Sequence, residues 1–137
     1  MRTRLAGALA AIVCVIPAKA ADVEAPFLGA AVYSTSQGCK KLQALAAGGP
    51  RNISTVPETL DRKGYHSWEG GCEIERIQQQ VKGKRWLVAL HCHEGPETQR
   101  QHETWELAPD GALLVTLKAK KFRYTKCPVV PAPEKKN

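Results

Sequence analysis

The sequence predicts a mainly all-β domain: an antiparallel meander that curls into a small barrel or half-barrel, with one short N-terminal helix and two disulfides. Three observations predict this fold class. Apolar and polar residues alternate from Cys72 onward, which is typical of strands that bury one face. Turn sequences rich in glycine and proline separate the alternating stretches. An even number of cysteines follows the apolar N-terminal run, which favours disulfide bonds.

Residues 1–20 have the features of a secretory signal peptide. Met1–Arg4 is basic, Leu5–Ile16 is apolar, and Ala18-Lys19-Ala20 is a small-x-small cleavage site. We therefore expect a mature chain that begins at Ala21 and resides in the periplasm or is secreted.

An alternative for this segment is a lipoprotein acylated at Cys14, although Val13 stands where a small residue is expected. No later apolar run approaches the ~20 residues that a helical membrane span needs, so a transmembrane protein is not expected.

The first part of the mature chain combines strand and helix signals. Residues 30–33 are consistent with a first strand, and Ser34-Thr35-Ser36 supplies residues suited to cap a helix. The composition of Cys39–Ala47 favours a short helix, which Gly48-Gly49-Pro50 should end.

Residues 52–71 are predicted to be mostly irregular. Asn52–Val56 is predicted as a short strand, and Pro57–Gly71 as a loop. This loop carries an aromatic pair, Tyr65 and Trp68, which we take as candidate binding residues because recognition commonly resides on loops.

The turn Val81-Lys82-Gly83 predicts the first hairpin of the meander. Glycine in the last position of a three-residue loop suits a turn with a bulge, and the loop pairs Gln80 with Lys84. Counting outward from this turn brings Cys72 opposite Cys92. The register therefore favours a disulfide between them.

That pairing leaves Cys39 and Cys127 for the second disulfide. Four cysteines allow three connectivities, and the alternative is Cys39–Cys72 with Cys92–Cys127.

Two further turns continue the meander. Pro109-Asp110-Gly111 pairs Ala108 with Ala112 and sets Trp105 opposite Val115, and the polar run Lys118–Lys121 joins the last two strands. The side chains expected to face the interior are Ile74, Trp86, Val88, Leu90, Trp105, Leu107, Leu113, Val115, Leu117, Phe122 and Tyr124.

Histidines form one candidate metal site. His91 and His93 alternate with inward residues and should point outward together. Matching the apolar faces sets Trp105 opposite Leu90 and brings His102 near His93. Three imidazoles on one outer face, with Glu94 and Glu97 in the adjoining loop, could bind zinc or copper.

Two features of the charged residues stand out: one glutamate that is expected to face inward, and a cluster of basic residues. The same register turns Glu103 inward near Cys92, whereas the other glutamates of the sheet are expected on the surface. Basic residues gather at two hairpin ends, where we expect solvated tips or contact with an anionic surface (Lys82, Lys84, Arg85, Lys118, Lys120, Lys121, Arg123 and Lys126).

Length and charge restrict the organisation. The chain has 137 residues, a length that indicates one domain, which we expect over residues 21–127. A flexible Pro-rich tail is expected over 128–137. The formal net charge of the whole chain is +7. Few aromatic residues accompany the basic ones, so nucleic acid is not an expected partner.

The arrangement of cysteines and turns resembles small periplasmic or secreted four-cysteine bacterial proteins of unassigned function. The shared features are an early cysteine before a helix, Gly71-Cys72, Cys92, the Pro-Asp-Gly turn, and the ending Tyr124-Thr-Lys-Cys127. More loosely, the chain is similar to periplasmic lysozyme inhibitors, which are also small, β-rich and disulfide-bonded. The resemblance implies a fold type and no activity.

These observations predict a non-enzymatic binding or inhibitor module, which acts through the loops Pro57–Gly71 and Glu94–Gln101 on a disulfide-clamped sheet. We expect a monomer without a cofactor, and the partner is an unidentified protein or cell-envelope component. The alternative is a periplasmic metal-binding protein that uses His91, His93 and His102.

Overall fold

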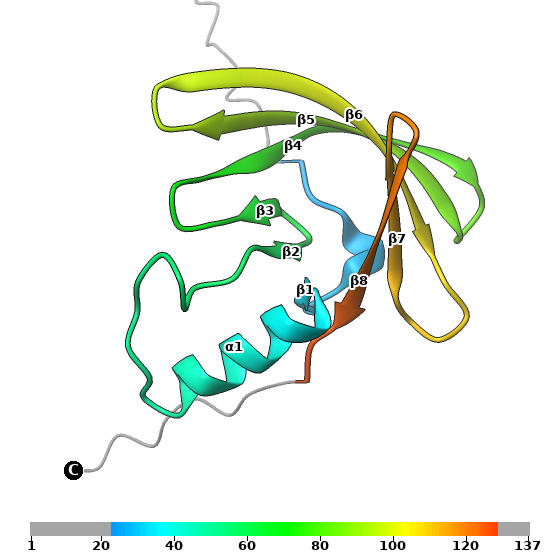
Figure 1. Cartoon of the computed structure of the whole chain (residues 1–137). Coiled ribbons are helices and arrows are strands. Elements are labelled where there is room, and N and C mark those ends of the chain that lie inside the picture. Colours follow the sequence, from blue (N-terminus) through cyan, green and yellow to red (C-terminus); the bar gives the residue numbers. More distant parts are fainter. Residues whose placement is uncertain (1–22, 129–137) are drawn as a thin grey trace, which may run out of the picture.

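A computed structural model describes residues 23–128, which form a closed antiparallel barrel of eight strands with one helix (Figure 1). The predicted signal peptide and most of the predicted tail lie outside the described residues. Each strand pairs with the next one along the chain, and β1 closes the barrel against β8. The elements are η1 (Pro26–Leu28), β1 (Tyr33–Ser34), α1 (Ser36–Ala46), β2 (Thr59–Asp61), β3 (Gly64–His66), β4 (Gly70–Val81), β5 (Arg85–Glu94), β6 (Glu97–Leu107), β7 (Leu113–Leu117) and β8 (Lys120–Lys126). This confirms the predicted fold class.

Helix α1 lies outside the barrel below β1 (Figure 1). The side chain of Thr35 accepts a hydrogen bond from the backbone N–H of Gly38 at 2.9 Å, so the helix is capped within the predicted Ser34–Ser36 segment. The disulfide Cys39–Cys127 ties α1 to the end of β8.

The second disulfide, Cys72–Cys92, joins β4 to β5. Both predicted pairings are therefore confirmed. The described residues include no helix of the length and apolarity that crossing a membrane requires.

The core lies between the inner faces of the long strands and an N-terminal plug. Phe27 of η1 stacks on Trp86 with ring centroids 3.6 Å apart and the ring planes 2° from parallel. Ala25 and Leu28 are buried beside it. This N-terminal plug, residues 25–28, closes the end of the barrel at which β5 begins, and the alternation pattern of the sequence did not predict this role.

Most of the predicted inner residues are buried. Leu107, Leu117 and Tyr124 are only partly buried, and Phe122 is 42% exposed. The structure adds Tyr33, Leu60 and Tyr65 from the short strands to the core.

Two predictions for the segment before β4 are wrong. Asn52–Val56 contains turns and no strand, because the Asn52 side chain accepts hydrogen bonds from the N–H groups of Ser54 and Thr55. The predicted loop Pro57–Gly71 contains β2 and β3, whose three residues each are too few to show alternation.

The hairpin turns differ in how well they match the prediction. The Pro-Asp-Gly turn has the expected pairing, and Trp105 lies opposite Val115. The last turn is shorter than predicted, because Leu117 pairs with Lys120. The first turn is shifted by one residue, so that Val81 rather than Gln80 begins the pairing, with Arg85.

Candidate functional site

One end of the barrel is open because its strands have unequal lengths. Strands β4, β5 and β6 have 12, 10 and 11 residues, whereas β7 and β8 have 5 and 7. The long strands therefore extend beyond the short ones (Figure 1). Their concave face is left uncovered there, and it forms a cavity of about 520 Å³.

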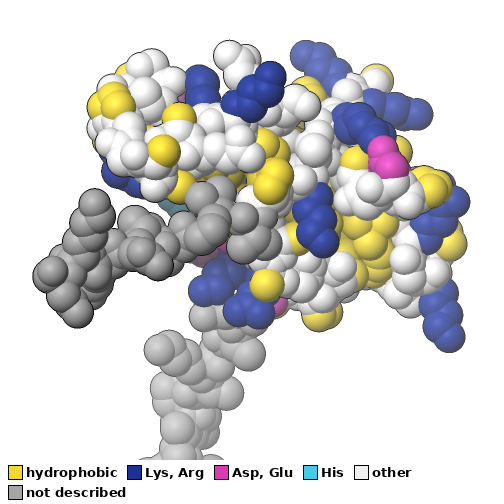
Figure 2. Space-filling model, turned by 90° about the horizontal axis from the view of Figure 1, so that it is seen from below, with side chains coloured by type: hydrophobic (Ala, Val, Ile, Leu, Met, Phe, Trp, Pro, Cys, Tyr) yellow, Lys and Arg dark blue, Asp and Glu magenta, His cyan; other side chains and the backbone are white. Residues whose placement is uncertain are grey.

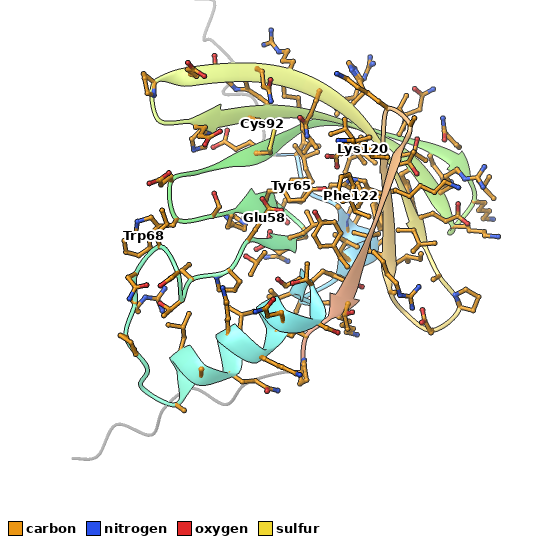
Figure 3. All side chains as sticks on the ribbon, viewed as in Figure 1. Glu58, Tyr65, Trp68, Cys92, Lys120 and Phe122 are labelled. Carbon is orange, nitrogen blue, oxygen red and sulfur yellow. A yellow bond between two sulfur atoms is a disulfide. The ribbon has the colours of Figure 1, made fainter. Side chains whose placement is uncertain are left out.

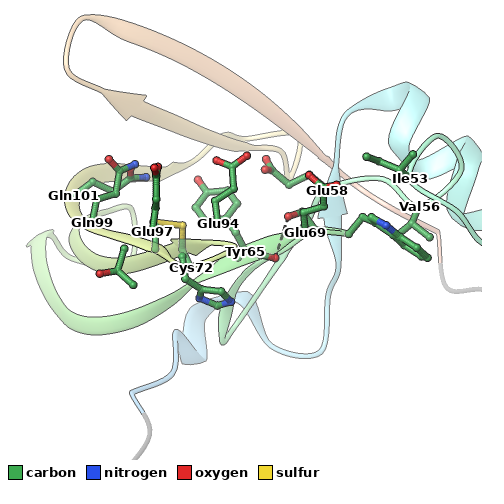
Figure 4. Close-up of a pocket in the computed structure, with 17 residues that line it drawn as sticks. Ile53, Val56, Glu58, Tyr65, Glu69, Cys72, Glu94, Glu97, Gln99 and Gln101 are labelled. Carbon is green, nitrogen blue, oxygen red and sulfur yellow. Dashed lines mark hydrogen bonds between the residues drawn. A yellow bond between two sulfur atoms is a disulfide. The ribbon is translucent and has the colours of Figure 1, made fainter.

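The floor of this cavity is rigid. The disulfide Cys72–Cys92 lies on it, with Gln99 opposite Cys92 in the next strand (Figure 4). Tyr65 adds its ring, which is 7% exposed and packs edge-on against Trp105 at a centroid distance of 6.2 Å.

A buried carboxyl group supports the floor from below. Glu103 is 4% exposed, and one of its oxygens accepts hydrogen bonds from Tyr65 Oη and Trp105 Nε1, both at 2.7 Å. Its other oxygen accepts from Gln101 Nε2 at 2.9 Å. Burial raises the pKa of Glu103 although all three donors favour the charged form. The inward orientation predicted for Glu103 is confirmed, but its strand partner is Val88 and not Cys92.

The wall of the cavity is acidic. Glu58, Glu69, Glu94 and Glu97 line it, and the lining contains no lysine or arginine. Figure 4 shows the carboxylates of Glu94 and Glu97 above the disulfide. Within the described part of the chain, none of these four carboxylates forms an ion pair.

The acidic cavity contrasts with the rest of the surface. The chain has a net charge of +7, and the face in Figure 2 shows many lysines and arginines but few carboxylates. The open end of this basic molecule therefore carries four carboxylates that have no ion-pair partner among the described residues, and a cleft focuses their field.

Trp68 stands at the rim of the cavity, in the turn between β3 and β4. Its side chain is 50% exposed and projects away from the barrel (Figure 3). The turn is held in place because the backbone N–H and the hydroxyl of Ser67 both donate to the carbonyl of Gly70, at 3.0 and 2.9 Å. The N–H of Gly95 donates to the carbonyl of Glu69 at 3.3 Å and so links this turn to the β5–β6 turn.

The two aromatic candidates from the sequence thus meet at one cavity, with different environments. Tyr65 belongs to β3 and its hydroxyl is occupied by Glu103, so it contributes to the floor. Trp68 offers its ring to the solvent. Their role in binding stays a prediction.

The register that brought the histidines together is wrong. Trp105 pairs with Trp86 rather than Leu90, which moves His102 opposite Ala89, while His93 pairs with Thr98. Matching apolar faces did not distinguish two alignments that differ by four residues. Among residues 23–128, no group of three histidine, cysteine or acidic side chains could hold a metal ion.

The prediction of a loop over Glu94–Gln101 is wrong. Glu94 pairs with Glu97 across a two-residue turn, and β6 begins at Glu97. In the first half of β6 the inward residues are Gln99 and Gln101, which face the cavity rather than the core. The apolar alternation that reveals a strand is therefore missing.

Comparisons with family models, curated proteins and solved structures find no match to this chain. The similarity to periplasmic lysozyme inhibitors stays a prediction.

Proposed function

We propose that this chain is a non-enzymatic binding or inhibitor module of the periplasm or the extracellular medium, and that the acidic cavity recognises positively charged groups of a partner. The partner is a protein or a component of the cell envelope. One observation carries the proposal: four carboxylates and a half-exposed indole line a cavity without lysine or arginine, on a chain that has a net positive charge with or without the predicted signal peptide.

The chemistry of the lining suits a cation. Carboxylates in a cleft concentrate positive ligands, and the face of the Trp68 ring attracts an ammonium or guanidinium group. The disulfide and the Glu103 hydrogen bonds hold the floor in one conformation, so binding has little ordering cost. The two disulfides also support an oxidising compartment.

The carboxyl with a raised pKa supports binding over catalysis. A perturbed carboxyl in a cleft is the usual candidate for a general acid. Glu103, however, is 4% exposed and both its oxygens accept hydrogen bonds from protein donors. A ligand in the cavity does not reach it, so its role is structural.

A titration with pentalysine amide tests this proposal. We expect saturable binding that quenches tryptophan fluorescence, requires Trp68 and weakens as salt is added. The double variant Glu94→Gln/Glu97→Gln should weaken binding by about tenfold, because it removes two carboxylates of the cavity.

The matched control is Glu73→Gln/Glu106→Gln, which removes the same charge outside the acidic cavity and leaves the Arg100–Glu75 ion pair intact. It should change the affinity by less than about twofold. Equal weakening by both double variants, or the absence of saturable binding, would contradict the cavity as the site.

A further inference from the structure

Strand β6 has a free edge next to the acidic cavity. It pairs with β5 along its whole length, from Glu97 to Glu106, but with β7 only from Thr104 to Leu107. Its first half therefore has a partner strand on one side only.

Two backbone hydrogen bonds show which residues of β6 direct their N–H and carbonyl groups toward that edge. The N–H of Leu107 donates to the carbonyl of Lys84 at 3.0 Å, so the odd-numbered residues of β6 direct their backbone groups toward β5. The N–H of Ala108 donates to the carbonyl of Ala112 at 2.9 Å, so the even-numbered residues direct theirs toward β7. Because the β5–β6 register has no shift, this parity holds along the whole strand.

Thr98, Arg100 and His102 are the even residues that lie beyond β7. Their N–H and carbonyl groups point outward, and no backbone hydrogen bond joins them to another segment within residues 23–128. All three residues are exposed. The edge also lacks proline and bulges, which proteins commonly use to block strand addition.

The same parity connects this edge to the cavity. Side chains of Gln99 and Gln101 line the acidic cavity, so the odd positions of β6 face it. A strand added to the edge would lie about 4.8 Å from β6 and share its two faces. Every second side chain of that strand would project into the cavity, toward Glu94 and Glu97.

We propose that the free edge of β6 binds an extended peptide segment of a partner by strand addition, with alternate lysine or arginine side chains in the acidic cavity. This inference rests on the proposed function and specifies the form of its ligand. Backbone groups of Thr98, Arg100 and His102 supply affinity, and the carboxylates with Trp68 select basic side chains.

A second copy of the chain is the competing occupant of the edge. Pairing two β6 edges antiparallel over all three free residues would set Arg100 opposite Arg100 of the other copy. Like charges directly opposite each other are destabilising, so the edge favours a foreign segment. Sedimentation analysis should find a monomer, and a dimer that dissociates on Arg100→Pro would overturn the peptide proposal.

The test uses the peptide acetyl-Lys-Thr-Lys-Thr-Lys-Thr-Lys-amide and two N-methylated versions. One version carries N-methyl groups on the backbone nitrogens of all three threonines. The other carries them on the backbone nitrogens of the second, third and fourth lysines. In an added strand only alternate N–H groups face β6, so one version should lose about tenfold or more in affinity while the other binds normally. Loss with methylated threonines indicates antiparallel addition, and loss with methylated lysines indicates parallel addition.

Amide exchange gives an independent readout on the protein. The N–H groups of Thr98, Arg100 and His102 should exchange fast in the free protein and slowly with the peptide bound. Those of Gln99 and Gln101 should be slow in both states, because they bond to β5.

Arg100→Pro removes one outward donor and keeps the bonds to β5, since proline is tolerated on an edge strand. It should abolish peptide binding with the fold intact. Arg100→Ala loses the same exposed ion pair with Glu75 but keeps the backbone N–H, so it should bind the peptide at least as tightly as the wild type. If both methylated peptides bind equally while Glu94→Gln/Glu97→Gln still weakens pentalysine, strand addition is wrong and the proposed function stands. If pentalysine does not bind, the proposed function itself fails.

Discussion

The hydroxyl of Tyr65 donates a hydrogen bond to a carboxylate oxygen of Glu103 at 2.7 Å and so joins β3 to β6 through the interior of the barrel. Trp105 Nε1 donates to the same oxygen at 2.7 Å. Burial raises the pKa of Glu103, and burial followed by the charge of Glu103 raises the pKa of Tyr65. This contact couples the core to the floor of the cavity.

Replacement of Glu103 by glutamine should change how stability depends on pH. The raised pKa means that the folded chain holds this proton more tightly than the unfolded chain. Glu103 therefore contributes stability that is present below its ordinary pKa of 4.5 and lost as the pH rises through its folded value. We expect the Tm of the wild type to fall relative to that of Glu103→Gln as the pH is raised above that ordinary value, in a series of thermal melts.

Glutamine can keep the hydrogen bonds of this site, which makes the comparison a fair one. Its amide oxygen can accept from Tyr65 and Trp105, and its amide N–H can donate to Gln101 once that side chain is turned over. Glu106→Gln is the control, because Glu106 bonds to Arg85 and is only partly buried. A pH profile of Glu103→Gln parallel to that of the wild type would show that Glu103 does not titrate differently on folding.

Trp105→Ala should lower stability, whereas Trp68→Ala should lower binding and leave stability nearly unchanged. Trp105 is 0% exposed and packs against Phe27 and Tyr65, so its loss should cost about 3–5 kcal/mol. Trp68 is 50% exposed, so its removal should leave the Tm within a few degrees and weaken binding of the basic peptide. Thermal melts in oxidising buffer measure the first effect. Equal large losses of stability would remove Trp68 as a recognition residue.

The hairpin registers show what the sequence determines and what it does not. The Pro-Asp-Gly turn predicted the pairing of Trp105 with Val115 correctly, because no bulge interrupts that hairpin. Cys72 and Cys92 also pair as predicted, although the turn between β4 and β5 was placed one residue too early. Two register shifts, between Ile74 and Arg76 and between Gln79 and Val81, offset that error. Apolar alternation does not encode such bulges.

The candidate site was predicted only in part. Aromatic residues are scarce in this chain, so Tyr65 and Trp68 stood out, and both line the cavity. The acidic wall was missed, because Glu58 precedes β2 and Glu94 ends β5, and only the closed barrel brings them together. The polar half of β6 gave no strand signal, since its inward side chains face a cavity instead of a core.

Removal of each disulfide should destabilise the chain to a different extent. Cys39 and Cys127 are separated by 88 residues, whereas Cys72 and Cys92 are separated by 20. Constraint of the unfolded chain grows with the enclosed loop, so Cys39→Ala/Cys127→Ala should cost about 1 kcal/mol more than Cys72→Ala/Cys92→Ala. Urea unfolding of the two double variants measures the difference. The opposite order would indicate that the Cys72–Cys92 bridge is needed for packing of the cavity floor.

Gly64→Ala should disturb the short strands that carry the cavity floor, while Gly83→Ala should not. Both glycines have positive φ, +132° at Gly64 and +67° at Gly83, so alanine is strained at each. A Cβ at Gly83 would meet nothing within 4 Å, and there we expect a loss of about 1–2 kcal/mol.

At Gly64 the added Cβ would overlap the carbonyl oxygen of Cys72 on the adjacent strand. Backbone cannot swing aside as a flexible side chain can, so β3 must move away from β4 and carry Tyr65 with it. The Tyr65–Glu103 hydrogen bond should then weaken. We expect Gly64→Ala to lose more stability in urea than Gly83→Ala and also to lower the affinity for the basic peptide. If the two variants lost equal stability and bound the peptide equally well, the close contact between β3 and β4 would not hold the floor in place.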